Sequence, residues 1–172
     1  FFGHRASNVG RADMVVYTKA VGADNPELRA AKRRKIPTFS YAEMLGVISR
    51  DRYTVAIAGT HGKTTTTAMI GHVLKRAGFD PTIIVGGVMR DGGTNFVPGR
   101  GRYFIVEACE YKKSFLNLNP RIIVVTNIDN DHLDYYKNMG NIQRAFGALV
   151  GKLPRDGYLV CDPHDANVKP II

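Results

Sequence analysis

The chain has 172 residues, of which 44% are hydrophobic and 23% charged, and its net charge is +9. This composition is typical of a globular protein of one or two domains, and no apolar run reaches the roughly 18 residues that a membrane-spanning helix needs. Its two cysteines, Cys109 and Cys161, fit neither a disulfide framework nor the paired spacing of a zinc site. We therefore expect a reducing, cytoplasmic location.

The basic residues are spread along the chain, with one local cluster at 32–35 (KRRK). This cluster has no interleaved aromatic residues and no zinc or RNA-binding motif, which nucleic-acid-binding segments usually carry. We predict a solvated helix end there, and no nucleic-acid or membrane partner. A non-catalytic nucleotide- or RNA-binding module stays open as an alternative, because of the net charge.

The first fifty residues predict the order strand, helix, strand, helix. Residues 14–17 and 36–39 are the short strand-like runs. The first helix is expected to begin near Pro26, which suits the first turn, and the second to begin after Ser40, a good N-cap residue. A polar break at 50–52 predicts a domain boundary.

After this break, strands and helices alternate. Residues 54–58 (TVAIA) are a continuous apolar run typical of a strand buried on both faces, and 64–77 have helical spacing that stops at Gly78. The alternation predicts an α/β fold, a mostly parallel sheet with flanking helices. We expect further strands at 82–85, 103–108, 122–126 and 158–161, a helix at 141–150, and a long loop or hairpin at 86–101.

The turn between the buried strand and its helix has the composition of a phosphate-binding loop. Glycines let the backbone close around an anion, and the following helix N-terminus points free N–H groups at it. The Lys63 ammonium would reach the outer phosphates, and the Thr64 hydroxyl would bind magnesium. The alternative is an ordinary strand-to-helix turn with an exposed lysine. The predicted ATP-binding residues are Gly59, Thr60, His61, Gly62, Lys63, Thr64 and Thr65.

Two further groups of polar residues follow predicted strands. Glu107 ends the run 103–106, and His132 lies in the acidic segment 126–134 after the strand at 122–125. In open α/β sheets ligands bind at the carboxyl ends of the strands, so Glu107 is a candidate magnesium ligand, and His132 could bind a metal or orient a phosphate. The alternatives are a solvated strand end for Glu107, a hydrogen-bonded loop histidine for His132, and helix caps for Asp131 or Asp134.

Taken together, these motifs resemble the Mur ligases of peptidoglycan synthesis, most closely the members that join L-alanine to UDP-N-acetylmuramate. The resemblance runs over nearly the whole chain. It rests on 59–66 (GTHGKTTT), 107–110 (EACE), 114–116 (SFL), 126–128 (TNI) and 131–134 (DHLD). It departs from the usual family pattern at Cys109, 111–113, Asp129 and 17–20.

The resemblance implies a P-loop-like central ATPase domain preceded by part of a Rossmann-like domain. Residues 1–50 would be the C-terminal part of the UDP-sugar-binding domain, and 52–172 the first part of the central ATP-binding domain. The amino-acid-binding domain would be absent. Because the chain opens without methionine and stops at Ile172, we expect a fragment that is inactive alone.

The resemblance also implies residue roles, with ATP and Mg²⁺ as cofactors. Lys63 would bind the β and γ phosphates and act in catalysis. Thr64 and Glu107 would hold magnesium, while His132 would hold a second magnesium or its surroundings and contribute to catalysis. His61 would lie near the muramate substrate. A ligase that attaches the murein tripeptide instead of L-alanine is the alternative within the family.

Overall fold

The computed structural model describes residues 2–89 and 93–172. Phe1 and residues 90–92 of the predicted 86–101 loop lie outside them. The chain divides into two compact units, one ending at Val47 and the other running from Ile48 to Ile172. No helix among the described residues is long and apolar enough to cross a membrane.

The first unit holds a two-stranded parallel sheet and the predicted helices. The side-chain oxygen of Asn25 accepts hydrogen bonds from the N–H groups of the first turn of its helix, which starts at Pro26 as expected. Residues 32–35 are exposed at the end of this helix, which confirms the solvated helix end. The elements are η1 (Ala6–Val9), β1 (Val15–Tyr17), α1 (Pro26–Arg33), β2 (Thr38–Ser40) and α2 (Tyr41–Arg50).

Ser40 caps α2 as predicted, through a reciprocal pair of hydrogen bonds. The Glu43 N–H donates to the Ser40 Oγ at 3.3 Å, and the Ser40 N–H donates to Oε2 of Glu43 at 2.6 Å. This is a capping box, which satisfies two N–H groups that would otherwise lack partners. The helix runs to Arg50, so the division between the compact units falls inside α2, a little before the predicted break.

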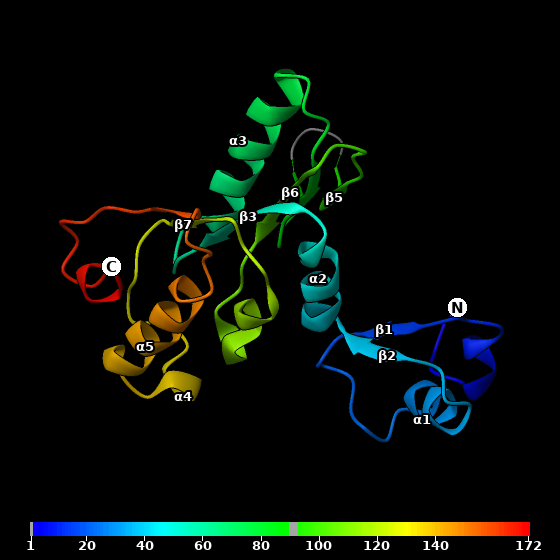
Figure 1. Ribbon diagram of the computed structural model, residues 1–172. Helices are drawn as coiled ribbons and strands as arrows, with labels where there is room; N and C mark the ends of the chain where they lie inside the picture. Colours follow the sequence, from blue (N-terminus) through cyan, green and yellow to red (C-terminus); the bar gives the residue numbers. More distant parts are fainter. Residues whose placement is uncertain (1, 90–92) are drawn as a thin grey trace. The chain divides into compact units, whose positions relative to one another are not determined.

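The second unit is built on a six-stranded sheet in the order β5-β4-β6-β3-β7-β8, parallel except for β5 (Figure 1). The mostly parallel α/β fold is therefore confirmed. Its strands are β3 (Tyr53–Ala58), β4 (Thr82–Ile84), β5 (Phe96–Val97), β6 (Tyr103–Glu107), β7 (Ile122–Val125) and β8 (Tyr158–Val160). Its further helices are α3 (Lys63–Arg76), η2 (Tyr111–Asn117), α4 (Leu133–Tyr136), α5 (Met139–Val150) and η3 (Lys169–Ile171).

Helices α3 and α5 lie on opposite faces of this sheet (Figure 1). Because side chains alternate between the faces along a strand, Val55, Ile57 and Ile105 share the α3 face, where Ile70 and Leu74 pack against their cluster. All but the first residue of β3 are buried. The central strand β3 therefore has a hydrogen-bonded strand on each side and is covered on both faces.

Three elements of this unit, η2, α4 and η3, were not predicted. β5 pairs antiparallel with β4, which agrees with the hairpin given as one of the two possibilities for residues 86–101. The short helices η2 and α4 follow β6 and β7, and their sequences are too short and too polar to give a helical period. Both segments carry residues of the candidate site.

Candidate phosphate-binding site

The carboxyl ends of β6, β3 and β7 meet at one edge of the sheet. In the register of the sheet Glu107 pairs with Ile57, and Val125 pairs with Ala58. The connections out of β3 and β7 leave toward opposite sides of the sheet, which is the kind of switch point where α/β proteins bind ligands. The predicted convergence of the three motifs on one edge is thus found in the structure.

The turn between β3 and α3 requires its first glycine. Gly59 has a φ of +136°, and a Cβ at this position would lie 2.0 Å from the Oγ1 of Thr126 and 3.0 Å from the carbonyl oxygen of Asn127. Gly62 is left-handed at a φ of +80° and immediately precedes α3. The turn therefore lies against the end of β7 while aiming the N-terminus of α3 outward.

Hydrogen bonds fix the turn to the segment after β7. The N–H of Thr60 donates to the carbonyl of Asn127 and the N–H of His61 to its Oδ1, both at 3.0 Å. The Thr126 hydroxyl donates to the His61 carbonyl at 2.6 Å. The first N–H groups of α3 have no partner within the helix, so they are the groups available to an anion.

Lys63 is folded back over this turn. Its Nζ donates to the carbonyls of Gly59 at 2.6 Å and Thr60 at 3.0 Å, and to Oε1 of Glu110 at 3.1 Å. The Glu110 side chain is only 5% exposed, and its Oε2 also lies 3.1 Å from Nζ. The ammonium therefore has three acceptors in place of a phosphate.

Thr64 and Glu107, two of the predicted magnesium ligands, are in direct contact. The Thr64 hydroxyl donates to Oε2 of Glu107 at 2.8 Å, and the N–H of Gly86 donates to the same oxygen at 2.7 Å. A hydroxyl and a carboxylate are oxygen ligands of the kind that Mg²⁺ prefers. This pair therefore suits a magnesium ion beside the phosphate-binding turn.

His132 lies with a different pair of carboxylates. Its Nε2 is 3.6 Å from Oε1 of Glu110, its Nδ1 is 3.8 Å from Oδ1 of Asp131, and the ring of Tyr111 stacks on its imidazole at 4.7 Å. One ligand atom from each of Glu110, Asp131 and His132 lies within 4.8 Å of the others, a spacing that suits a cation. The three predicted metal ligands thus fall into two groups, which Lys63 and Glu110 connect.

Neither Asp131 nor Asp134 is the N-cap of the helix after β7, which the sequence had left open as an alternative. His132 itself is the N-cap of α4, left-handed at a φ of +51°, and caps through no side-chain hydrogen bond among the described residues. Asp131 instead accepts the N–H of His132 at 2.7 Å. Asp134 lies in the first turn of α4.

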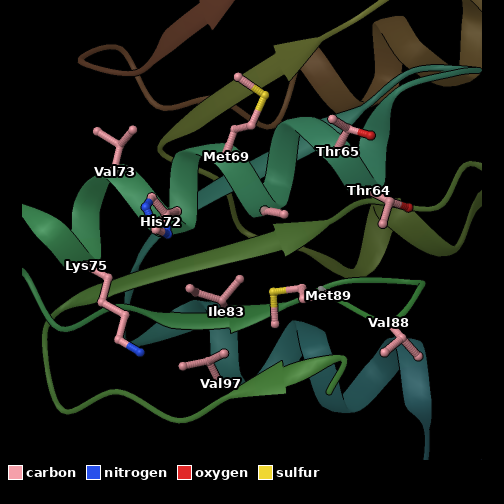
Figure 2. Close-up of a pocket in the computed structure, with 11 residues that line it drawn as sticks. Thr64, Thr65, Met69, His72, Val73, Lys75, Ile83, Val88, Met89 and Val97 are labelled. Atoms are coloured by element: carbon pink, nitrogen blue, oxygen red, sulfur yellow. The ribbon is translucent and has the colours of Figure 1, made fainter. Parts of the chain in front are cut away.

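The turn borders two depressions. The smaller, of about 350 Å³, is lined by Glu107 and by the residues from Thr60 to Thr65. Figure 2 shows the larger, of about 820 Å³, which is lined by residues of α3, among them Met69 and Val73, and by Ile83 and Val97 of β4 and β5. Thr64 and Thr65 line both, so a ligand phosphate on the turn would lie at the end of an apolar groove.

Two parts of the chain match known protein families. The Mur ligase middle domain matches residues 57–171, well over half of the chain, and the Mur ligase family catalytic domain matches residues 1–53. The chain belongs to the Mur ligase family. The resemblance inferred from the motifs is confirmed.

The similar curated Mur ligases are longer proteins. The chain is 48% identical to a UDP-N-acetylmuramate–L-alanine ligase of Caldicellulosiruptor bescii and 46% identical to one of Clostridium tetani. Each match covers 100% of the chain and 38% of the relative. The chain therefore spans somewhat more than a third of the length of these relatives.

Solved Mur ligase structures share the fold over nearly the whole chain. One is a UDP-N-acetylmuramate:L-alanyl-γ-D-glutamyl-meso-diaminopimelate ligase from Neisseria meningitides, with a TM-score of 0.85 and 27% identity over 99% of this chain and 59% of that one. Another is the UDP-N-acetylmuramate–alanine ligase MurC from Thermotoga maritima. Its TM-score is 0.84 and its sequence identity is 31%, and the match covers 99% of this chain and 40% of that one. The chain thus resembles structures of both acceptor types.

Sequence reasoning left two residues of this Mur ligase site without a role. Glu110 lies in the 107–110 motif, but its contact with Lys63 joins residues 47 positions apart. Asn127 lies in the 126–128 motif, but its bonds to the turn join residues 66 positions apart or more. The motifs marked these positions, and only the folded chain gives their partners.

Proposed function

We propose that the protein to which this chain belongs uses ATP to join L-alanine to UDP-N-acetylmuramate. The observation that carries the proposal is the meeting of Lys63, Thr64 and Glu107 at one sheet edge in a Mur ligase chain. The L-alanine acceptor is favoured by the 46 to 48% identity to L-alanine ligases over the entire chain. A cytoplasmic location stays a prediction.

The proposed reaction has two steps. A carboxylate oxygen of UDP-N-acetylmuramate attacks the γ phosphorus of ATP and ADP leaves, which gives an acyl phosphate. The amine of L-alanine then attacks the acyl carbon and gives up a proton, the C–O bond to phosphate breaks, and an amide bond and free phosphate result. Because the carboxylate and the triphosphate repel each other, neutralising charge and aligning the reactants supply most of the rate enhancement.

The residues have distinct proposed roles in this reaction. The N-terminus of α3 and the turn from Gly59 to Thr65 hold the phosphates, and Lys63 neutralises the β and γ phosphates. Thr64 and Glu107 would hold a magnesium ion, which supplies further positive charge there. His132, with Glu110 and Asp131, offers the second cation position, and His61 at the exposed rim would lie near the muramate.

We also propose that residues 1–50 are the end of the UDP-sugar domain and 52–172 the beginning of the ATP-binding domain. The separate family matches to 1–53 and 57–171 support this division. The two compact units, which divide after Val47, support it as well.

Replacing the central cation tests the proposal. In the complete protein, Lys63→Ala is expected to lower substrate-dependent release of phosphate by a factor of about 10³ or more, because the transferred phosphoryl group loses its fixed positive charge. The matched control is Lys32→Ala, an exposed lysine at the end of α1, which should leave the rate unchanged. Wild-type turnover by Lys63→Ala would refute the assignment.

An acceptor competition separates the two members of the family. The complete protein is assayed for ADP formation with L-alanine or with the tripeptide L-alanyl-γ-D-glutamyl-meso-diaminopimelate. We expect turnover with L-alanine. Turnover with the tripeptide alone would favour the function named for the Neisseria structure, which this chain matches at 27% identity.

A further inference from the structure

Glu110 is a buried carboxylate shared by two residues of the site. Both of its oxygens lie 3.1 Å from the Nζ of Lys63, and its Oε1 lies 3.6 Å from the Nε2 of His132. Its Oε2 is buried and has no hydrogen-bond donor of suitable geometry among the described residues. The charge of this carboxylate is therefore balanced mainly by the Lys63 ammonium.

Lys63 has no free donor while it makes this contact. An ammonium has three N–H donors, and here the carbonyls of Gly59 and Thr60 and the carboxylate of Glu110 are its three acceptors. A phosphate in the turn must take Nζ away from at least one of them. Glu110 holds the ammonium most strongly, because its carboxylate carries a full negative charge whereas the two carbonyl oxygens carry only partial charges.

The backbone holds Glu110 where it is. Its carbonyl accepts the Tyr136 hydroxyl at 2.5 Å and the N–H of Lys113 at 2.8 Å. Just after Glu110, Lys112 and Lys113 inside η2 both have a left-handed backbone, which kinks this short helix. The carboxylate therefore stays behind when the lysine moves toward a nucleotide.

We propose that Glu110 is a positioning residue that holds Lys63 folded over the turn and competes with nucleotide phosphates for its ammonium. The proposal rests on the nucleotide-binding role given to Lys63 above. It adds that a metal-free nucleotide must compete with the Glu110 carboxylate for the Lys63 ammonium. Removing that anion therefore strengthens the binding of metal-free nucleotide, whereas loss of a purely structural residue would weaken it.

The first experiment measures ADP binding to the complete protein by calorimetry, with EDTA present so that no divalent cation takes part. Glu110→Gln is expected to bind ADP about threefold to tenfold more tightly than the wild type. Glu107→Gln is the matched control, because it removes one negative charge from the same site but from a carboxylate bonded to Thr64. It should have a smaller effect.

Repeating the measurement in a Lys63→Ala background isolates the competition. Without the ammonium there is nothing to release, so adding Glu110→Gln should change ADP affinity no more than adding Glu107→Gln. Equal tightening by Glu110→Gln with and without Lys63 would overturn the proposal, as would weaker binding by Glu110→Gln in the otherwise wild-type protein.

A second experiment tests the pairing without any nucleotide. Lys63→Ala leaves a buried carboxylate without its cation, so the Tm of the complete protein should fall by about 3 to 10 °C. Adding Glu110→Gln should restore most of this loss, because the remaining side chain is neutral. If the double variant is no more stable than Lys63→Ala, the pairing is refuted.

The two experiments also separate this proposal from the proposed function. A wild-type protein that binds no ADP in the presence of magnesium would refute the nucleotide-binding function, and the competition with it. Normal binding of magnesium-ADP together with an unchanged or lowered metal-free affinity in Glu110→Gln would refute the role of Glu110 alone.

Discussion

The two compact units are both built from alternating strands and helices, but their strand residues are buried to very different extents. The first unit pairs only β1 and β2, and Ser40 is the one buried residue of the two strands. In the second unit β3 has partners on both sides and five of its six residues are buried. A two-stranded sheet is marginally stable by itself, whereas a central strand packed on both faces is rigid.

The deeper burial of the second unit explains why the charged site lies there. The residues around Lys63 are held by hydrogen bonds from the ends of β6 and β7, which the central sheet keeps in register. Catalytic groups need positions fixed to about half an ångström, and supporting contacts on rigid elements provide this. Four comparisons of variants test this contrast.

The largest effect is expected where the turn meets β7. Gly59→Ala places a Cβ against the Thr126 hydroxyl and the Asn127 backbone, so either the turn or the β7 end must move. We expect a loss of about 3 kcal/mol or more in the free energy of unfolding, and at least about a hundredfold weaker ADP binding. Calorimetry and denaturant titration measure both.

Gly62→Ala is the control for this substitution. Nothing lies within 4 Å of a Cβ at Gly62, whose φ is +80°, so only backbone strain of about 1 kcal/mol is added. If Gly59→Ala cost no more than Gly62→Ala, the close approach of the turn to β7 would be wrong.

The next effect compares the cores of the two units. Ile105→Ala empties a fully buried position between β3 and β4 and should cost about 2 to 5 kcal/mol. Val9→Ala in the small cluster with Ala30 and Ala31 should cost less, because fewer methyl groups are lost from a thinner core. Denaturant unfolding measures both, and equal losses would contradict the contrast.

A smaller effect is expected at the support of Glu110. Tyr136→Phe removes the hydroxyl that donates to the Glu110 carbonyl, at a cost of about 1 kcal/mol. Burial of the hydroxyl, and then the nearby negative charge of Glu110, raise the pKa of Tyr136 from its ordinary value of 10.0 to about 12. The folded chain therefore keeps a proton that the unfolded chain releases, and this stabilisation is present below pH 10 and lost as the pH rises toward 12.

Unfolding at a series of pH values checks this expectation. The wild-type free energy of unfolding should fall more steeply between pH 10 and 12 than that of Tyr136→Phe. Parallel curves for the two proteins would show that the Tyr136 proton is not linked to folding.

The smallest effect is expected in the first unit. Ser40→Ala removes one half of the capping box with Glu43 and should cost about 1 kcal/mol, measured by thermal unfolding. Ser7→Ala, at an exposed serine of η1, is the control and should change stability by less than about 0.5 kcal/mol. A silent Ser40→Ala would mean that the cap does not limit the stability of α2.

The local elements and the chemistry of the phosphate-binding turn follow from the amino-acid sequence alone. The apolar run of β3, the glycines at 59 and 62 and the helical spacing of α3 act between near neighbours, so they can be read along the chain. Their order gave the parallel sheet, and the motifs gave the family. η2 and α4 left no such local signal, because these short polar segments do not hold enough residues to show a helical period.

Which charged groups share a partner depends on how the chain folds. Lys63, Glu110 and His132 come from three connections that the sheet register brings to one edge, and their separations along the chain hide the contacts. The position of a buried carboxylate between two partners depends on how strands β3, β6 and β7 pack. A linear pattern records that a glutamate is present, whereas its ion pair depends on distances that the fold creates.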